Sequence, residues 1–166
     1  MFRLVALLAI VFVSVQFSQA PPRAQIGDET PKHDERVRKI LKEDGVQYTV
    51  DTDGDFKVIF QMGDDRTQMA FIRSRTEEYR NLEIREIWSF GYQSSTDVFP
   101  AEVASRLLED TFIKKLGAWA KIGQRALFVV KVSADANSES LMSALQMALE
   151  SADEMEEELT GDKDEF

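Results

Sequence analysis

The sequence contains no cysteine and a single histidine, His33, in 166 residues. Without cysteine the chain cannot form a disulfide, a thiolate zinc site, an iron–sulfur cluster or a thiol nucleophile. With one histidine, catalytic or metal sites that need two imidazoles are excluded as well. The sequence also lacks a Gly-rich phosphate loop, a Gly-x-Ser-x-Gly nucleophile elbow and a dinucleotide-binding fingerprint. None of the enzyme classes that depend on these features is indicated.

Basic residues are fewer than acidic ones, 20 against 30, and the net charge is −10. An acidic chain repels phosphate backbones unless its basic residues cluster, so we expect no nucleic-acid partner. The acidity is concentrated at one end. Residues 150–166 contain nine acids and one lysine, whereas residues 21–149 contain 21 acids and 18 bases. We expect the acidic end to serve solubility or a weak attraction to a basic partner.

The first 20 residues have the composition of a secretory signal peptide. A short basic start, Met1–Phe2–Arg3, precedes the apolar run 4–17 (LVALLAIVFVSVQF). That run is shorter than the about 20 residues that span a bilayer. Small residues at 18–20 favour cleavage after Ala20, but Pro21 hinders it and a second site extends to residue 24. An uncleaved anchor and a buried helix are the alternatives. The prediction is a secreted or periplasmic protein with no stable membrane span after cleavage.

The rest of the chain predicts one α+β domain at 31–159, after a linker at 21–30 and before an acidic tail at 160–166. A Thr30–Pro31 cap opens a first helix that ends at Gly45. Period-two alternation predicts a four-stranded antiparallel meander at 46–50, 56–60, 69–72 and 82–92. In its last strand Ile84 and Ile87 break phase, which predicts a bulge near Arg85–Glu86.

Two further helices and a β-hairpin complete the expected order. Residues 100–116 have helical spacing, with an apolar stripe of Val103, Leu107, Leu108 and Phe112. A hairpin around Gly123–Gln124 joins strands at 119–122 and 126–132. A long C-terminal helix starts near residue 137 or 138 and ends near 159; its stripe is Leu141, Leu145, Ala148, Ala152, Met155 and Leu159. We expect the helices to pack mainly on one face of the sheet. The stripe of the long helix also has coiled-coil spacing, so a dimer contact there is the alternative.

The best candidate metal motif is Asp51–Thr52–Asp53–Gly54–Asp55. Aspartates at positions 1, 3 and 5 resemble an EF-hand loop, but position 6 is Phe56 and position 12 is Met62. We therefore favour a hairpin turn and assign no metal ligand and no cofactor. His33, on a polar helix start, is expected to be a solvated surface residue.

Glu86 is the acid set most clearly among large apolar neighbours, and it is the first candidate for carboxylate acid–base chemistry. A bulge residue or an exposed strand position is the simpler interpretation. A loose run of basic residues, Arg73, Arg75, Arg80 and Arg85, alternates with glutamates at 77, 78, 83 and 86. This pattern favours cross-strand ion pairs on the solvent-exposed face of a sheet over an anion-binding site. No catalytic residue is assigned.

Four large aromatic residues lie in the predicted strands: Trp88, Phe90, Tyr92 and Trp119. All but Phe90 carry a polar ring group. Core packing is the default for such residues. If Trp88, Phe90 and Trp119 were exposed together on one sheet face, they would mark a partner site.

The order of elements resembles the type III secretion chaperone-like fold, and in detail the YbjN-type family of bacterial proteins. Residues 106–111 (RLLEDT) resemble the family's helix after the meander, 117–119 (GAW) the start of its hairpin, and 145–159 its closing helix with Ala152-Asp153-Glu154. The resemblance implies a non-enzymatic, chaperone-like or regulatory binding module, often dimeric, and brings no catalytic residues. Secretion chaperones of this fold act in the cytosol, whereas this chain begins with an export signal.

Together these observations predict an exported, non-enzymatic module that binds a protein or peptide and that is compatible with a homodimer. A sheet edge or the aromatic sheet face would bind an extended peptide. The alternatives are an exported hydrolase that uses Glu86 and a calcium-dependent module that uses Asp51, Asp53 and Asp55.

Overall fold

The computed structural model describes residues 32–166 except residues 64 and 162, so the predicted signal peptide and linker lie outside the described residues. The fold is α+β, as predicted, with three helices and a seven-stranded antiparallel sheet in the described part. The helices are α1 (Glu35–Glu43), α2 (Ala101–Ile113) and α3 (Ser138–Thr160). None of the described helices is both long and apolar enough to cross a membrane.

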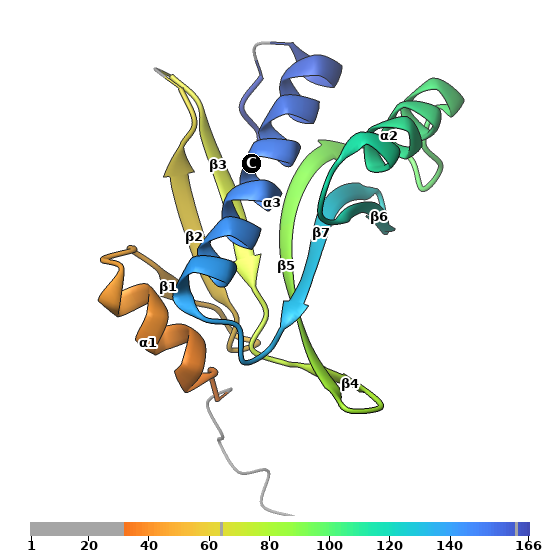
Figure 1. Ribbon diagram of the computed structural model, residues 1–166. Helices are drawn as coiled ribbons and strands as arrows, with labels where there is room; N and C mark the ends of the chain where they lie inside the picture. Colours follow the sequence, from red (N-terminus) through yellow and green to blue (C-terminus); the bar gives the residue numbers. More distant parts are fainter. Residues whose placement is uncertain (1–31, 64, 162) are drawn as a thin grey trace, which may run out of the picture.

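The sheet follows the predicted meander and then the predicted hairpin. Its path runs β1-β2-β3-β5-β7-β6, and β4 pairs with β5 off this path. The strands are β1 (Thr49–Val50), β2 (Phe56–Gln61), β3 (Thr67–Ile72), β4 (Glu77–Tyr79), β5 (Leu82–Gln93), β6 (Ala118–Ile122) and β7 (Arg125–Ser133). The short strand β4, which the alternation does not predict, makes a hairpin with β5 that extends beyond the rest of the sheet (Figure 1).

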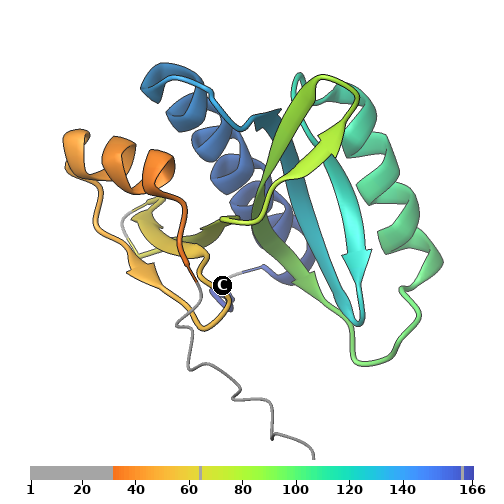
Figure 2. The same cartoon turned by 90° about the horizontal axis from the view of Figure 1, so that it is seen from below.

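All three helices lie on one side of the sheet, as expected (Figures 1 and 2). We call this side the helix face and the opposite side the open face. The main core is formed where α1 and α3 pack on the central strands, around Phe56, Ile87, Phe128 and Leu145. The predicted stripe of α3 is buried there except at its last residue, Leu159, which is half-buried. Since this stripe packs on its own sheet, it is not available as a coiled-coil seam between copies.

The bulge in β5 is at Gly91, and the predicted position near Arg85–Glu86 is wrong. Pairing with β7 shifts between Phe90 and Tyr92. Arg85, Ile87 and Ser89 alternate regularly on the helix face, and all three are buried. The phase break in the sequence arises because an arginine occupies a core position.

The bulge occurs where a side chain cannot fit. A Cβ at Gly91 would lie 2.6 Å from Cη2 of Trp119 and 2.9 Å from the carbonyl oxygen of Ala152. A glycine lets α3 and the indole approach the strand this closely.

The predicted start of the first helix and the predicted tail also need correction. The first helix begins at Glu35, not after Thr30–Pro31, because the side chain of Asp34 caps it by accepting the N–H of Arg36 at 2.8 Å. The sequence predicts an acidic tail at 160–166 outside the domain, but its described residues 163–166 fold back onto the molecule through hydrogen bonds to Arg66, Thr67 and Glu156.

Candidate interaction surfaces

The outer side of α2 carries exposed apolar side chains, two of which, Leu108 and Phe112, the sequence pattern places in the core. The helix buries Val103, Leu107 and Asp110. Leu108, Phe112 and Ile113 are 69%, 90% and 64% exposed; we call these three residues the α2 ridge. Neighbouring residues on a helix differ by about 100°, so burial of Leu107 turns Leu108 toward solvent. The predicted stripe was therefore right for Val103 and Leu107 and wrong for Leu108 and Phe112.

The polar residue on the buried side of α2 explains this rotation. Asp110 is 4% exposed, and its Oδ2 accepts a hydrogen bond of 2.8 Å from the Nε1 of Trp119. The indole in turn packs edge-on against Phe128. This bond gives the buried carboxylate a partner and leaves Leu108 and Phe112, two positions to either side, on the outside.

A pocket on the open face is lined by Leu116, three residues after the ridge in the chain. Its volume is about 580 Å³, and its lining includes Glu86, Trp88, Leu116, Ala118, Ile122 and Lys131. Leu116 is 39% exposed and Ile122 50%. Leu116 and Ile122 thus place exposed apolar groups at this pocket, beside the edge strand β6. Isolated exposed apolar residues are ordinary on proteins, but several that gather at one pocket are typical of an interaction site.

Trp88 and Phe90 share the open face, whereas Trp119 does not. Phe71 and Phe90 make an edge-on contact with ring centroids 6.1 Å apart, and the guanidinium of Arg73 lies 4.1 Å from the centroid of Trp88. Trp119 belongs to the helix face with Phe128, and the bulge turns Tyr92 to the same side, against Phe99. The structure therefore does not bring Trp88, Phe90 and Trp119 together as one exposed surface.

Glu86 lines the pocket as an ion-paired residue. Its Oε1 lies 3.1 Å from Nζ of Lys131, and its Oε2 accepts a 2.9 Å hydrogen bond from Nε1 of Trp88. It faces the open side of the sheet in regular register, so it is not a bulge residue. Among the described residues that line the pocket, Glu86 is the one carboxylate. The paired-carboxylate mechanism thus has no second acid here, and acid–base chemistry by Glu86 stays a prediction.

The aspartates at 51, 53 and 55 form the predicted turn between β1 and β2. Oδ1 of Asp51 accepts the N–H groups of Asp53 and Asp55, both at 2.9 Å. Asp55 points elsewhere: it is 2% exposed and accepts hydrogen bonds or ion pairs from Ser74 and Arg73. In the part of the chain that the structure describes, no three potential ligands converge into a metal site.

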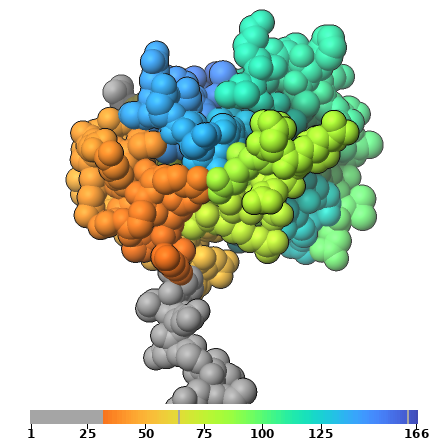
Figure 3. All heavy atoms as spheres, turned by 60° about the horizontal axis from the view of Figure 1, so that its bottom comes forward, coloured from red at the N-terminus to blue at the C-terminus, as the bar shows by residue number. Residues whose placement is uncertain are grey.

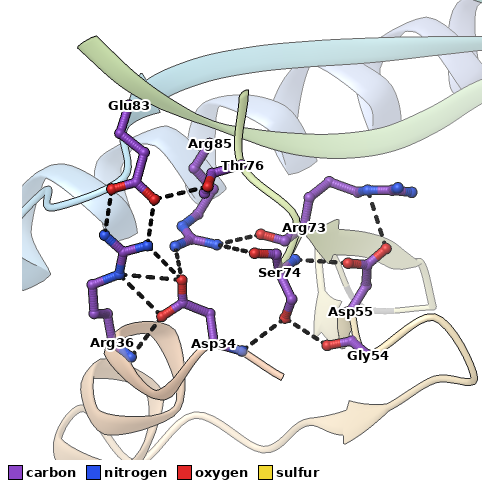
Figure 4. Close-up of polar contacts among 9 residues, drawn as sticks. All are labelled: Asp34, Arg36, Gly54, Asp55, Arg73, Ser74, Thr76, Glu83 and Arg85. Atoms are coloured by element: carbon purple, nitrogen blue, oxygen red, sulfur yellow. Dashed lines mark hydrogen bonds and ion pairs between the residues drawn. The ribbon is translucent and has the colours of Figure 1, made fainter. Parts of the chain in front are cut away.

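A partly buried polar network joins the start of α1 to the hairpin β4–β5 (Figure 4). Its centre is Arg85, which is 1% exposed and lies 2.5 Å from Oδ2 of Asp34. Arg36 binds Asp34 from the other side and makes two hydrogen bonds of 2.7 Å to Glu83. Figure 3 shows α1 and the hairpin side by side over this region. The prediction of arginine–glutamate pairs on the wet face of the sheet is therefore wrong for Arg85, which is the centre of a buried pair.

The two carboxylates of this network have strongly altered acidity. Burial by itself would raise the pKa of Asp34, but hydrogen bonds from Arg36 and Arg85 outweigh it and hold that pKa well below its usual range. The hydrogen bond from Arg36, assisted by Thr76, lowers the pKa of Glu83 to about 2. Perturbed carboxylates often occur at active sites, but here each has arginine partners that account for the shift.

The same network extends to β3 and the β1–β2 turn. The hydroxyl of Ser74 donates to the carbonyl of Gly54 at 2.5 Å and accepts the N–H of Asp34 at 3.0 Å. Next to it, His33 packs edge-on against the buried Phe56, and its Nε2 is 3.0 Å from Oε1 of Glu35. His33 is therefore a partly covered residue at the helix start and not a fully solvated one. The remaining arginines, Arg75 and Arg80, are at exposed positions of the β3–β4 loop and hairpin.

Comparisons with known families and with curated proteins do not assign a function to these surfaces. No family model matches the chain, and no curated protein matches it either.

Proposed function

We propose that this chain is an exported, non-enzymatic module that binds a protein or peptide through the α2 ridge and the open-face pocket that Leu116 lines. The observation that carries the proposal is the ridge itself. Phe112 is 90% exposed on a helix whose other side is well packed. A large aromatic held in solvent on a rigid helix contributes nothing to the core, and such residues are frequent anchors of protein interfaces. The resemblance to chaperone-like modules agrees with this interpretation.

The chemistry of the surface indicates the kind of partner. The ridge and Leu116 are apolar, and exposed charges of both signs lie beside them in the chain: Glu109 follows Leu108 directly, and Lys115 precedes Leu116. A protein surface with an apolar centre and charges of both signs at its rim would be complementary. A second copy of this chain is one candidate, because its own C-terminal helix ends in a run of acids.

The test is a pair of charge substitutions at exposed apolar sites. Phe112→Glu introduces a carboxylate on the ridge, and Leu82→Glu does the same at a 52% exposed position on the distant hairpin. We expect the wild-type protein either to self-associate in sedimentation velocity or to cross-link to one defined protein from periplasmic extract through a photoreactive residue at position 109, which is exposed beside the ridge. Phe112→Glu should lose this association by at least tenfold, and Leu82→Glu should retain it.

Two results would overturn the proposal. One is a strictly monomeric wild-type protein that captures no partner at position 109. The other is an association that Phe112→Glu and Leu82→Glu weaken equally, because that would show a non-specific effect of added charge.

A further inference from the structure

The sheet forks between β3 and β5. Backbone pairing of these strands covers three positions and ends at Ala70↔Ser89. Beyond this point Thr67–Met69 stay paired with β2, whereas Phe90–Gln93 stay paired with β7. Figure 1 shows the ends of β3 and β5 pointing away from each other. The fork exposes two inner strand edges, each with backbone groups that need partners.

Side chains replace the missing ladder at the base of the fork. Gln68 is fully buried, and its Nε2 donates to the carbonyl of Phe90 at 2.7 Å and to Oγ of Ser89 at 2.9 Å. The hydroxyl of Ser89 donates to the carbonyl of Met69 at 2.7 Å. Oε1 of Gln68 is buried and has no hydrogen-bond partner among the described residues. The base of the fork is therefore polar and incompletely satisfied.

The 163–166 segment of the same chain occupies the open end of the fork. The carboxylate of Asp164 accepts the N–H of Thr67 at 3.3 Å and its hydroxyl at 3.2 Å. Two residues later, the ring of Phe166 packs on Phe90, with centroids 6.0 Å apart. The carboxylate of Asp164 therefore accepts an N–H at the edge of β3 that a neighbouring strand would otherwise bind. The ring of Phe166 packs over Phe90 beside it.

Two further contacts hold the segment in place. Arg66 donates to the carbonyl of Lys163 at 3.1 Å, and the buried carboxylate of Glu156 accepts the N–H of Glu165 at 2.6 Å. Arg66 is itself fixed by Asp153, 2.8 Å away. The guanidinium of Arg125 lies 5.3 Å from the centroid of Phe90. Cationic groups thus lie on two sides of the fork, Arg66 just before β3 and Arg125 at the start of β7.

We propose that the fork is a docking slot for an extended acidic peptide with an aromatic residue two positions after a carboxylate. The 163–166 segment fills this slot in cis, and a partner segment of the same chemistry replaces it. One carboxylate, one ring and two backbone contacts hold the segment, so its release exposes little surface and requires no unfolding of the core. The slot is distinct from the α2 ridge, so this inference goes beyond the proposed function and neither needs the other to hold.

The test offers the segment in trans to full-length chains. The probe is a labelled heptapeptide with residues 160–166 (TGDKDEF), and its binding is measured by fluorescence anisotropy. We expect the variant Asp164→Asn/Phe166→Ala to bind the probe about tenfold more tightly than the wild-type chain. This factor is the ratio of two quantities. The effective concentration of the segment in cis is on the order of 1 mM, and the Kd of the free peptide is about 0.1 mM. A control peptide with the same two substitutions should not bind.

Hydrogen exchange provides a second measurement in the same proteins. The amide of Thr67 should exchange faster in the double variant than in the wild-type chain, and added probe should restore its protection. Phe112→Glu should leave probe binding unchanged, which separates the slot from the ridge. Equal probe affinity for the double variant and the wild-type chain, or no binding to either, would overturn the proposal. Equal binding of the probe and the control peptide would overturn it as well.

Discussion

Arg85 is the largest side chain that the sheet buries completely, and its charge is balanced mainly by Asp34. Its guanidinium also donates to the carbonyl oxygens of Arg73 and Ser74. A buried pair of this kind contributes little net stability compared with apolar packing, but removal of one member leaves an uncompensated charge. The pair thus makes the fold depend on the correct docking of α1.

We predict that Arg85→Met lowers the free energy of unfolding by about 3 kcal/mol, measured by urea denaturation. Methionine fills the space of the arginine stem, so the loss reports the backbone carbonyls that lose their donor and the weaker pairing of Asp34, which keeps Arg36. Arg85→Met/Asp34→Asn should recover at least 1 kcal/mol of this loss. A double variant as unstable as the sum of the two single variants would contradict the prediction.

A second residue-scale prediction concerns the bulge. Gly91→Ala should lower the free energy of unfolding by about 2 kcal/mol, because the new methyl group would meet Trp119 and the backbone of Ala152. Gly63→Ala is the matched control. Nothing lies within 4 Å of a Cβ at Gly63, and we expect a change of less than about 0.5 kcal/mol there. Equal effects of the two substitutions would show that the close approach at Gly91 has no energetic weight.

At the scale of the element, α2 offers two adjacent leucines in opposite environments. Leu107 is 5% exposed and Leu108 is 69% exposed. Leu107→Ala should therefore cost about 2–4 kcal/mol of unfolding free energy through lost burial and a new cavity. Leu108→Ala should cost less than about 0.5 kcal/mol in a dilute sample, because it removes surface that is already in water.

The same pair distinguishes a free ridge from a self-associating one. If copies of the chain cover the ridge, the cost of Leu108→Ala should rise with protein concentration, while that of Leu107→Ala should not. Thermal unfolding at 1 μM and at 100 μM measures this difference. A large cost of Leu108→Ala at low concentration would contradict the assignment of the exposed side of α2.

At the scale of the whole molecule, the polar network that joins α1 to the hairpin makes stability depend on pH. The fold lowers the pKa of Glu83 from 4.5 to about 2 and that of Asp34 from 3.8 to a lower value. Because the folded state holds these groups ionised, their contribution is complete above the unfolded pKa values and is lost as pH falls through the folded ones. Burial raises the pKa values of Asp55 and Glu156, so these two groups act in the opposite sense.

Comparison with one variant isolates the contribution of Glu83. Glu83→Gln should be less stable than the wild-type protein at pH 7, and the difference should shrink steadily between pH 4.5 and pH 2. Urea denaturation at several pH values measures it. A difference that is the same at pH 7 and pH 2.5 would show that the ion pair with Arg36 does not distinguish the folded from the unfolded state.

Much of the fold was predictable because its signals are local. Alternation and helical spacing identify the elements and their order, and Gly123–Gln124 marks the hairpin turn correctly. The Asp51–Asp55 turn was also predicted correctly, since the Asx-type hydrogen bonds that shape it lie within five residues. The candidate surfaces were harder. The α2 ridge was predicted to be core because its spacing is helical, and no local signal indicates which side of an apolar helix is covered. The buried Asp110 is the one residue that could have indicated the covered side.

By itself, the sequence determined the α+β class, the order of the elements, the concentration of acid at residues 150–166 and the absence of thiol chemistry. These properties follow from composition and from periodicities within about 20 residues. The tertiary structure decided the burial of Arg85, the position of the bulge, the exposure of the α2 ridge and the fork with its 163–166 segment. Asp34 and Arg85 are 51 residues apart, and Thr67 and Asp164 are 97 apart. Such contacts depend on the packing of the whole chain, because it alone brings their partners together.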